Sequence, residues 1–448
     1  MSKLAAYIIW IEMKVIVSLI IAAVSVGAFA QEDTVRVMQY NLLNYGNYTS
    51  YCNTNNNNVD DKDGYLTTIL DYVQPDIFTV NELGVDFVGL ENQYAQRILD
   101  NTLNINGVTK YQKAEHTGGS YLVNMLYYNS DKLVLHSQDF ISNDANNEGL
   151  VREIDFYNLY HNDPNLASHN DTVFLTVVVA HLKAGSGQDD QDERAAASLA
   201  VMGYLDANDG AKGNRILCGD FNVKGDTELA YSHLFNYSNT NVRFKDPLNE
   251  PGYWGGAWEY KHLHTQSTRD NVSTGDCPSG GGLDDRFDFV LTSEPIIWGD
   301  NGISYLPNTY TAVGNDGTSY NNDLNTITNS SVPPAVADAL FNLSDHLPVV
   351  MDMRISKDLV SGISQPNVEQ LNIEFTNPVE NELTVRLPNN ARLQQLQLFD
   401  LQGKLVYQNN TPHQTHFVIS TEQLKTGVYF LSVQTQDGNH QSYKVVKF

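Results

Sequence analysis

Two polar side chains at the end of an apolar segment are the first candidates for chemistry in this sequence. Residues 216–218 are apolar, and the segment continues as Gly219-Asp220-Phe221-Asn222. Alternate side chains of a strand point to the same side, so the Asp220 carboxylate and the Asn222 carboxamide can hold one phosphate or one metal ion together. The pattern is equally typical of a strand that ends in an Asx turn. A catalytic function therefore requires further residues that converge on this pair.

Six further polar residues stand at or near the ends of other apolar segments. They are Asn41, Glu82, His181, Asp288, Asp345 and His346. Structural explanations exist for several of them: His181 is typical of a half-buried histidine, and Glu82 of a residue that ends a strand. Asp288 gives the strongest single signal, because a carboxylate inside an apolar strand is costly to bury without a partner.

The types of these side chains favour chemistry on a phosphate ester. Glu82, Asp345 and Asn41 offer the hard oxygen ligands that suit Mg²⁺ or Ca²⁺, whereas zinc prefers histidine and cysteine. Such an ion polarises a phosphoryl oxygen and neutralises the charge that develops during hydrolysis. His346 is suited to proton transfer, and Asp288 is the candidate carboxylate that orients its ring.

The elements that must position these residues alternate between strands and helices. We expect strands at residues 35–40, 77–80, 122–128, 172–180, 216–223 and 287–291, and another after Pro348. Helices are predicted at residues 65–73, 91–102 and 190–206, and the polar residues 53–63 are predicted to form a solvated loop. This order predicts an α/β domain with a site at the rim of packed sheets.

The charge and the cysteines limit the classes of protein that fit. Lys and Arg total 27 against 53 Asp and Glu, so the net charge is -26. This excludes a basic protein that holds nucleic acid by long-range attraction, but not an enzyme that binds phosphates through a local cation. Cys218 is expected to be a small buried hydrophobe. Cys52 and Cys277 lie in loop-like sequence, where a disulfide is the natural pairing and two free thiols are the alternative.

The two ends of the chain differ from the middle. Residues 1–30 have the pattern of a signal peptide, with an apolar run at 15–26 that is too short for a stable membrane span, and we expect translation to begin at Met13. Residues 31–355 carry the candidate residues, 356–370 resemble a linker, and 371–448 consist of short alternating strands typical of a small β-sandwich. We expect a monomer.

The segments that carry the candidate residues resemble, in order, the signature elements of the endonuclease/exonuclease/phosphatase superfamily, over roughly residues 34–355. They are Asn41-Leu42-Leu43-Asn44, Asn81-Glu82, Ala180-His181-Leu182, Gly219-Asp220-Phe221-Asn222, Phe287-Asp288-Phe289-Val290-Leu291 and Ser344-Asp345-His346-Leu347-Pro348. That superfamily includes pancreatic-type deoxyribonucleases, abasic-site endonucleases, sphingomyelinases and inositol-polyphosphate phosphatases. The resemblance implies a four-layer α/β sandwich, in which two central β-sheets are flanked by helices.

The resemblance also implies roles for single residues. Glu82 would be the main Mg²⁺ ligand, with Ca²⁺ or Mn²⁺ as alternative ions, and Asn41 and Asp345 would belong to the metal site. Asp220 would position or deprotonate the attacking water, while Asn222 and His181 would bind phosphoryl oxygens. Asp288 would orient His346, which stabilises or protonates at the reacting phosphate. The reaction would be direct hydrolysis of a P–O bond by water.

Some features of the sequence differ from the signature elements of that superfamily or are not part of them. Asn81 occupies a position where glutamine is more common, and Arg152 is a possible phosphate contact whose alternative is a surface arginine paired with Glu153 or Asp155. Residues 252–260 form an aromatic loop that would stack bases or touch lipid, with ordinary packing as the alternative. The absence of a long exposed apolar hairpin counts against a sphingomyelinase.

The tail resembles a C-terminal sorting domain of the type IX secretion system. The similar segments are Asn377-Pro378-Val379-Glu380-Asn381-Glu382-Leu383, Leu398-Phe399-Asp400-Leu401-Gln402-Gly403-Lys404, Leu424-Lys425-Thr426-Gly427-Val428-Tyr429-Phe430 and Lys444-Val445-Val446-Lys447-Phe448. This implies export across the outer membrane by the type IX machinery; a carbohydrate-binding β-module is the alternative. We expect a secreted, metal-dependent phosphodiesterase, foremost an endonuclease that hydrolyses DNA, with RNA as an alternative substrate. The alternatives are a phosphatase or phospholipid phosphodiesterase of the same fold and a non-catalytic surface binding module.

Overall fold

The computed structural model of this protein describes residues 32–88, 91–115, 117–118, 120–169, 172–273, 276–356, 373–387, 393–400, 404–409, 415–435 and 440–448. The expected signal peptide, with the proposed start at Met13, lies outside the described residues. The expected linker also lies outside them, apart from residue 356. The chain divides into two compact units, with the boundary between residues 359 and 360, and each unit is described by itself.

Two β-sheets form the centre of the first unit. The first sheet has the strand order β13-β15-β1-β2-β6-β5, with β14 also paired to β15. Its strands are β1 (Glu32–Tyr45), β2 (Ile77–Gly84), β5 (Tyr111–Lys113), β6 (Leu122–Asn129), β13 (Ile303–Tyr305), β14 (Thr311–Ala312) and β15 (Val349–Ser356). The second sheet has the order β11-β12-β10-β9-β8-β7. Its strands are β7 (Leu133–Asn143), β8 (Gly149–His161), β9 (Phe174–His181), β10 (Arg215–Asp220), β11 (Phe244–Lys245) and β12 (Asp288–Ser293).

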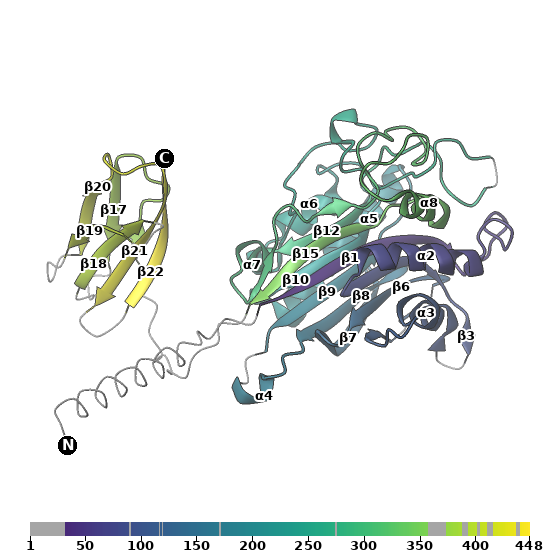
Figure 1. Ribbon diagram of the computed structural model, residues 1–448, viewed down its shortest axis with the longest axis horizontal. Coiled ribbons are helices and arrows are strands. Elements are labelled where there is room, and N and C mark those ends of the chain that lie inside the picture. The colour runs from purple at the N-terminus through teal and green to yellow at the C-terminus, as the bar shows by residue number, and fades with distance from the viewer. Residues whose placement is uncertain are drawn as a thin grey trace, which may run out of the picture. The chain divides into compact units, whose positions relative to one another are not determined.

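Helices cover the outer faces of the two sheets, as Figure 1 shows for α2 and α5. The helices are α2 (Val59–Val73), α3 (Gln93–Ile98), α4 (Leu166–His169), α5 (Gln188–Asp209), α6 (Leu229–Asn236), α7 (Glu294–Trp298) and α8 (Pro334–Leu343). A short π-helix (Leu99–Leu103), two 3₁₀ helices (Thr240–Val242 and Trp258–Tyr260) and the short pair β3 (Phe87–Val88) and β4 (Glu91–Asn92) complete the unit.

The alternation of side chains along β9 separates two hydrophobic cores. Val177 and Val179 belong to the core that lies between the sheets and under α2 and α8. Val178 and Ala180, which point the other way, belong to the core shared with α5 and α6. A strand buried on both faces explains the unbroken apolar run in the sequence. The first unit is therefore a four-layer α/β sandwich, and this prediction is confirmed.

Helix α2 begins earlier than the sequence predicts. The Asn58 side chain accepts a hydrogen bond from the backbone N–H of Asp60 and caps the helix, and Asp60 and Asp61 lie in its first turn. Carboxylates are favourable there because the N-terminal end of a helix carries partial positive charge. The prediction of a solvated loop through residue 63 is therefore wrong beyond Asn58, and the helix starts six residues before the expected position.

The second unit consists of strands in two sheets. One sheet has the order β16-β17-β20 and the other β19-β18-β21-β22. The strands are β16 (Glu374–Phe375), β17 (Glu382–Arg386), β18 (Leu393–Asp400), β19 (Leu405–Asn409), β20 (His416–Ser420), β21 (Gly427–Thr435) and β22 (His440–Lys447). Leu383 and Val385 of one sheet share a core with Leu396 and Leu431 of the other. The predicted all-β tail is confirmed, although β20 was not predicted. Within the residues that the structure describes, no helix is both long and apolar enough to span a membrane.

Candidate active site

Strand register brings several candidate residues to one edge of the two sheets. In the parallel pair β9 and β10, His181 lies opposite Asp220. In the antiparallel pair β10 and β12, Asp220 lies opposite Asp288. In the other sheet, the parallel pair β1 and β2 places Asn41 opposite Asn81, next to Glu82. Because parallel strands end at the same edge of a sheet, residues far apart in the sequence become neighbours there.

Asn41 links the two sheets at this edge. Its Nδ2 donates to Glu82 Oε1 at 3.0 Å and to Asp220 Oδ2 at 3.1 Å, and lies 3.4 Å from His346 Nε2. Its Oδ1 accepts the backbone N–H of Leu43 at 2.9 Å, which fixes the orientation of the amide. Asn41 therefore contacts the expected metal ligand, the expected base and the expected histidine at once.

His346 and Asp288 form a buried pair. His346 Nδ1 lies 2.7 Å from Asp288 Oδ2, and Nε2 lies 3.7 Å from Asp220 Oδ2. Burial acts to lower the pKa of His346, but the charges of Asp288 and Asp220 outweigh it and raise this pKa well above its usual value. Nδ1 of the ring faces Asp288, and Nε2 faces Asp220 and the other candidate residues.

Glu82, His181 and Asp220 form a group that could hold a metal ion, with ligand atoms all within 4.8 Å of one another. His181 Nε2 lies 3.5 Å from Asp220 Oδ2 and 4.0 Å from Glu82 Oε1. Burial raises the pKa of Asp220 to about 7, and the negative charges of Asp288 and Glu82 act in the same direction. Burial and the charge of Arg152 hold the pKa of His181 well below its usual value, so this ring is neutral and can donate a lone pair.

The backbone at Glu82 and Asn222 adopts the left-handed conformation that non-glycine residues seldom take, with φ of 57° and 53°. Strand β10 ends at Asp220, so the expected alternation of Asp220 and Asn222 along one strand is wrong. The Asx turn forms instead, because Asp220 Oδ1 accepts the backbone N–H of Asn222 at 3.0 Å. Asn222 Nδ2 donates to Leu182 O at 3.3 Å, on the segment that carries His181.

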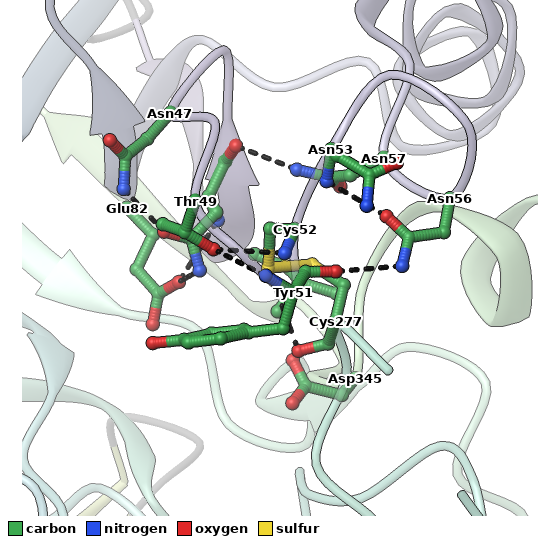
Figure 2. Close-up of a disulfide and its surroundings, with 12 residues drawn as sticks. Asn47, Thr49, Tyr51, Cys52, Asn53, Asn56, Asn57, Glu82, Cys277 and Asp345 are labelled. Atoms are coloured by element: carbon green, nitrogen blue, oxygen red, sulfur yellow. Dashed lines mark hydrogen bonds between the residues drawn. A yellow bond between two sulfur atoms is a disulfide. The ribbon is translucent and has the colours of Figure 1, made fainter. Parts of the chain in front are cut away.

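Asp345 lies beside this group and is held differently. Its Oδ2 accepts the backbone N–H of Ser279 at 2.7 Å, and its Oδ1 is buried with no hydrogen-bond partner among the described residues. Figure 2 shows Asp345 and Glu82 close to the disulfide between Cys52 and Cys277, the pairing expected from the sequence. Cys218 is free and buried, as expected.

Arg152 is directed toward the site and not toward its neighbours in sequence. Its Nη1 is buried without a hydrogen-bond partner in the described part of the chain, and it lines a hollow together with His181 and Lys183. Burial lowers the pKa of Arg152, and the charges of Glu82 and Asp220 oppose that shift. The Asp155 carboxylate instead accepts hydrogen bonds from Thr117 and Asn124.

Sequence reasoning missed two residues that hold this site together. The amide nitrogen of Gln266 lies 2.7 Å from His346 Nε2. Lys62 is buried in α2, and its Nζ donates to the carbonyls of Leu42 and Leu43. Gln266 lies in a loop, and Lys62 in a polar segment, where nothing in the sequence distinguishes them from solvated residues. Asn81, noted only as a departure, accepts the backbone N–H of Asp220 at 2.9 Å.

The aromatic loop divides into packed and exposed parts. Trp254 is fully buried, and its Nε1 donates to Glu250 O at 2.9 Å. Tyr253 and Trp258 are exposed, and Lys261 Nζ lies 4.6 Å from the centre of the Trp258 ring. Of the four aromatic side chains in residues 252–260, Trp254 is therefore core packing, Tyr260 is half-buried, and Tyr253 and Trp258 remain exposed.

The chain is similar to solved structures at low identity. The chain is 18% identical to the human Nocturnin catalytic domain with bound sulfate, over 72% of this chain and 97% of that one, with a TM-score of 0.42. It is 11% identical to D. rerio TDP2 complexed with single-strand DNA product, over 72% and 99%, with a TM-score of 0.43. For an endonuclease/exonuclease/phosphatase from Beutenbergia cavernae DSM 12333, the identity is 13%, the coverage 92% and 99%, and the TM-score 0.40. Among curated proteins, none matches this chain.

The second unit matches a protein family directly. Residues 374–447 match the secretion system C-terminal sorting domain, a range that includes every strand from β16 to β22. The predicted sorting domain is therefore confirmed, and its presence implies an interaction with the type IX secretion machinery. The match of residues 374–447 to this sorting domain indicates export to the cell surface or the extracellular space.

Proposed function

We propose that the first unit is a divalent-metal-dependent phosphoric ester hydrolase, foremost an exported endonuclease that cleaves DNA and also RNA. The observation that carries this proposal is the buried His346–Asp288 pair. Nδ1 of His346 contacts Asp288, and Nε2 of the same ring lies 3.7 Å from Asp220 Oδ2. A histidine oriented by one carboxylate and facing another is suited to proton transfer at a reacting phosphate. The neighbouring carboxylate of Glu82, which accepts a hydrogen bond from Asn41, adds a ligand for the cation that phosphate chemistry needs.

The donor set supports a divalent cation at Glu82. Glu82, His181 and Asp220 bring their ligand atoms together, and Asp345 Oδ1 is a buried oxygen without a partner in the described residues. Carboxylates packed this closely repel one another, and a cation relieves that repulsion. We assign Glu82 as the main ligand and Asp345 as a second carboxylate of the metal site, and Mg²⁺ as the ion, with Ca²⁺ or Mn²⁺ as alternatives. Asn41 belongs to this site through its Nδ2, which donates to Glu82, and not as an oxygen ligand, because its Oδ1 accepts the Leu43 N–H. When bound, the ion supplies Lewis-acid polarisation of a phosphoryl oxygen.

The side chains of the protein would perform the remaining steps. Asp220 accepts the proton of the attacking water, because its Oδ2 lies between Asn41 and the two histidines at this edge. Neutral His181 and the Asn222 amide bind phosphoryl oxygens. His346 acts through Nε2 to stabilise or protonate at the reacting phosphate, and Asp288 keeps the ring oriented through Nδ1. The product is formed by direct attack of water on phosphorus.

Incubation of the purified chain with supercoiled plasmid DNA tests this proposal. We expect Mg²⁺-dependent nicking that a chelator abolishes and added Mg²⁺ restores. Parallel samples with RNA, sphingomyelin vesicles and a small phosphodiester distinguish a nuclease from a phospholipid phosphodiesterase or a phosphatase. If none of these substrates is hydrolysed with Mg²⁺, Ca²⁺ or Mn²⁺, the enzymatic proposal is wrong and a surface binding module is the better description.

Arg152 is expected to contribute to substrate binding. In the Arg152→Met variant we expect kcat/KM to fall roughly 10- to 100-fold, mostly through KM, because a hydrogen bond to a charged group contributes about 1.5–3 kcal/mol. Initial rates across substrate concentrations measure both constants. Arg386→Met, the same change in the second unit, is the matched control. A kcat/KM of Arg152→Met within twofold of the unmodified protein would exclude the contact.

A further inference from the structure

A bulge in strand β1 carries two of the groups that hold Glu82. The pairing of β1 with β2 is interrupted between Asn41 and Tyr45. Leu43 and Asn44, within this interruption, take the left-handed conformation with φ of 46° and 49°. At one end of the bulge Asn41 Nδ2 donates to Glu82 Oε1, and near the other the backbone N–H of Asn44 donates to Glu82 Oε2 at 2.9 Å. The shape of the bulge therefore sets the position of both carboxylate oxygens.

The side chain of Lys62 donates hydrogen bonds to the backbone of this bulge. Its Nζ donates to Leu42 O at 2.7 Å and to Leu43 O at 2.6 Å, and only 3% of the residue is exposed. Buried carbonyls turned out of a sheet need donors, and a lysine with three N–H groups can satisfy two carbonyls at once. Burial lowers the pKa of Lys62 to about 7, and the charges of Glu82 and Asp345 oppose that shift.

The disulfide packs against a residue of the same bulge. Cys52 and Cys277 form a small buried cluster with the Leu43 side chain. Two residues beyond Cys277, the backbone N–H of Ser279 donates to Asp345 Oδ2. Figure 2 shows the bond joining the segment that follows β1 to the segment that contacts Asp345, with Glu82 nearby. The cross-link therefore connects the backbone that orients Glu82 to the backbone that orients Asp345.

We propose that Lys62 and the Cys52–Cys277 disulfide together position Glu82 and Asp345 for binding a divalent cation. We call these three residues, with the bulge at Leu42–Asn44, the carboxylate clamp. The inference rests on the proposed function only in taking Glu82 and Asp345 as metal-site residues. Lys62, Cys52 and Cys277 are positioning residues, because each acts through the backbone that contacts a carboxylate.

The affinity of the full chain for Mn²⁺, measured from the free-ion signal in electron paramagnetic resonance, tests this proposal. In Lys62→Met, and separately in Cys52→Ala with Cys277→Ala, we expect the Mn²⁺ dissociation constant to rise about 10- to 100-fold, the range for groups that orient metal ligands. Cys218→Ala, which removes a buried sulfur elsewhere, and Lys245→Met, on an exposed lysine, are expected to stay within twofold of the unmodified protein.

Thermal unfolding followed by circular dichroism separates positioning from folding. A purely structural role would lower the Tm and leave the Mn²⁺ dissociation constant unchanged at temperatures where the variant is folded, and that result would overturn the proposal. If one variant does not fold, the Mn²⁺ dissociation constant of the other variant tests the proposal. If neither folds, the folded unmodified chain is treated with a phosphine, which takes an oxygen from water and leaves two thiols, and the same rise in the dissociation constant is expected.

The failure of the clamp and the failure of the proposed function give different results. An unmodified protein that binds Mn²⁺ but hydrolyses no phosphate ester contradicts the proposed function, while weakened Mn²⁺ binding in the variants still supports the clamp. Unchanged Mn²⁺ affinity in the folded variants contradicts the clamp, whatever the hydrolytic activity of the unmodified protein.

Discussion

Replacement of His346 by alanine is expected to lower turnover about 10³-fold, within the range for loss of a proton-transfer group. The reason is geometric: Nε2 is the atom of the His346–Asp288 pair that faces Asp220 and the other candidate residues, and no other described imidazole lies within hydrogen-bond distance of Asp288. We expect kcat to fall more than KM changes, because the group acts on the reacting atoms and not on the rest of the substrate. Steady-state rates at saturating Mg²⁺ measure both constants.

The matched control is His262→Ala. His262 is exposed and pairs with Glu250 at 2.9 Å, so its loss is expected to leave turnover unchanged. His346→Ala also leaves the buried Asp288 without its partner, which lowers the free energy of unfolding. Rates are therefore compared well below the Tm of the variant, measured by circular dichroism. If folded His346→Ala keeps more than a tenth of the turnover, His346 does not have the assigned role.

The fold could be predicted wherever burial leaves a clear pattern in the sequence. Strand β9 is buried on both faces, so its valines form an unbroken run, and α5 has an apolar stripe between Ala195 and Leu205. The hairpin of β7 and β8 was not predicted. Much of β7 is exposed or half-buried without strict alternation, so its sequence resembles a loop. Helix α8 was missed because it is short and begins at Pro334, directly after Pro333.

The candidate site could be predicted as a set of residues, but not as a set of contacts. Asn41, Glu82, His181, Asp220, Asp288 and His346 stand near strand ends in the sequence, and strand register is enough to bring most of them together. The contact of Asn41 with Asp220 depends on how one sheet packs on the other, which no local pattern encodes. The same is true of Gln266 and Lys62, whose partners lie on other elements.

Replacement of Glu82 by glutamine is expected to raise the Mg²⁺ concentration for half-maximal activity about 100-fold, since the ligand charge that offsets dehydration of the ion is lost. Glutamine keeps the shape of the side chain and an oxygen that can accept the Asn44 N–H, so the fold is expected to remain intact. A titration of activity against Mg²⁺ measures the shift. A smaller effect is expected at saturating Mg²⁺ than at low Mg²⁺.

The control for this change is Glu115→Gln, which makes the same substitution on an exposed side chain. The Mg²⁺ titration also distinguishes a metal ligand from a group that only holds Asn41. Loss of the hydrogen bond from Asn41 to Glu82 would lower activity equally at all Mg²⁺ concentrations, because Asn41 also contacts Asp220 and lies near His346. A uniform loss would therefore assign Glu82 to the positioning of Asn41, whereas a shift of the midpoint assigns it to the cation.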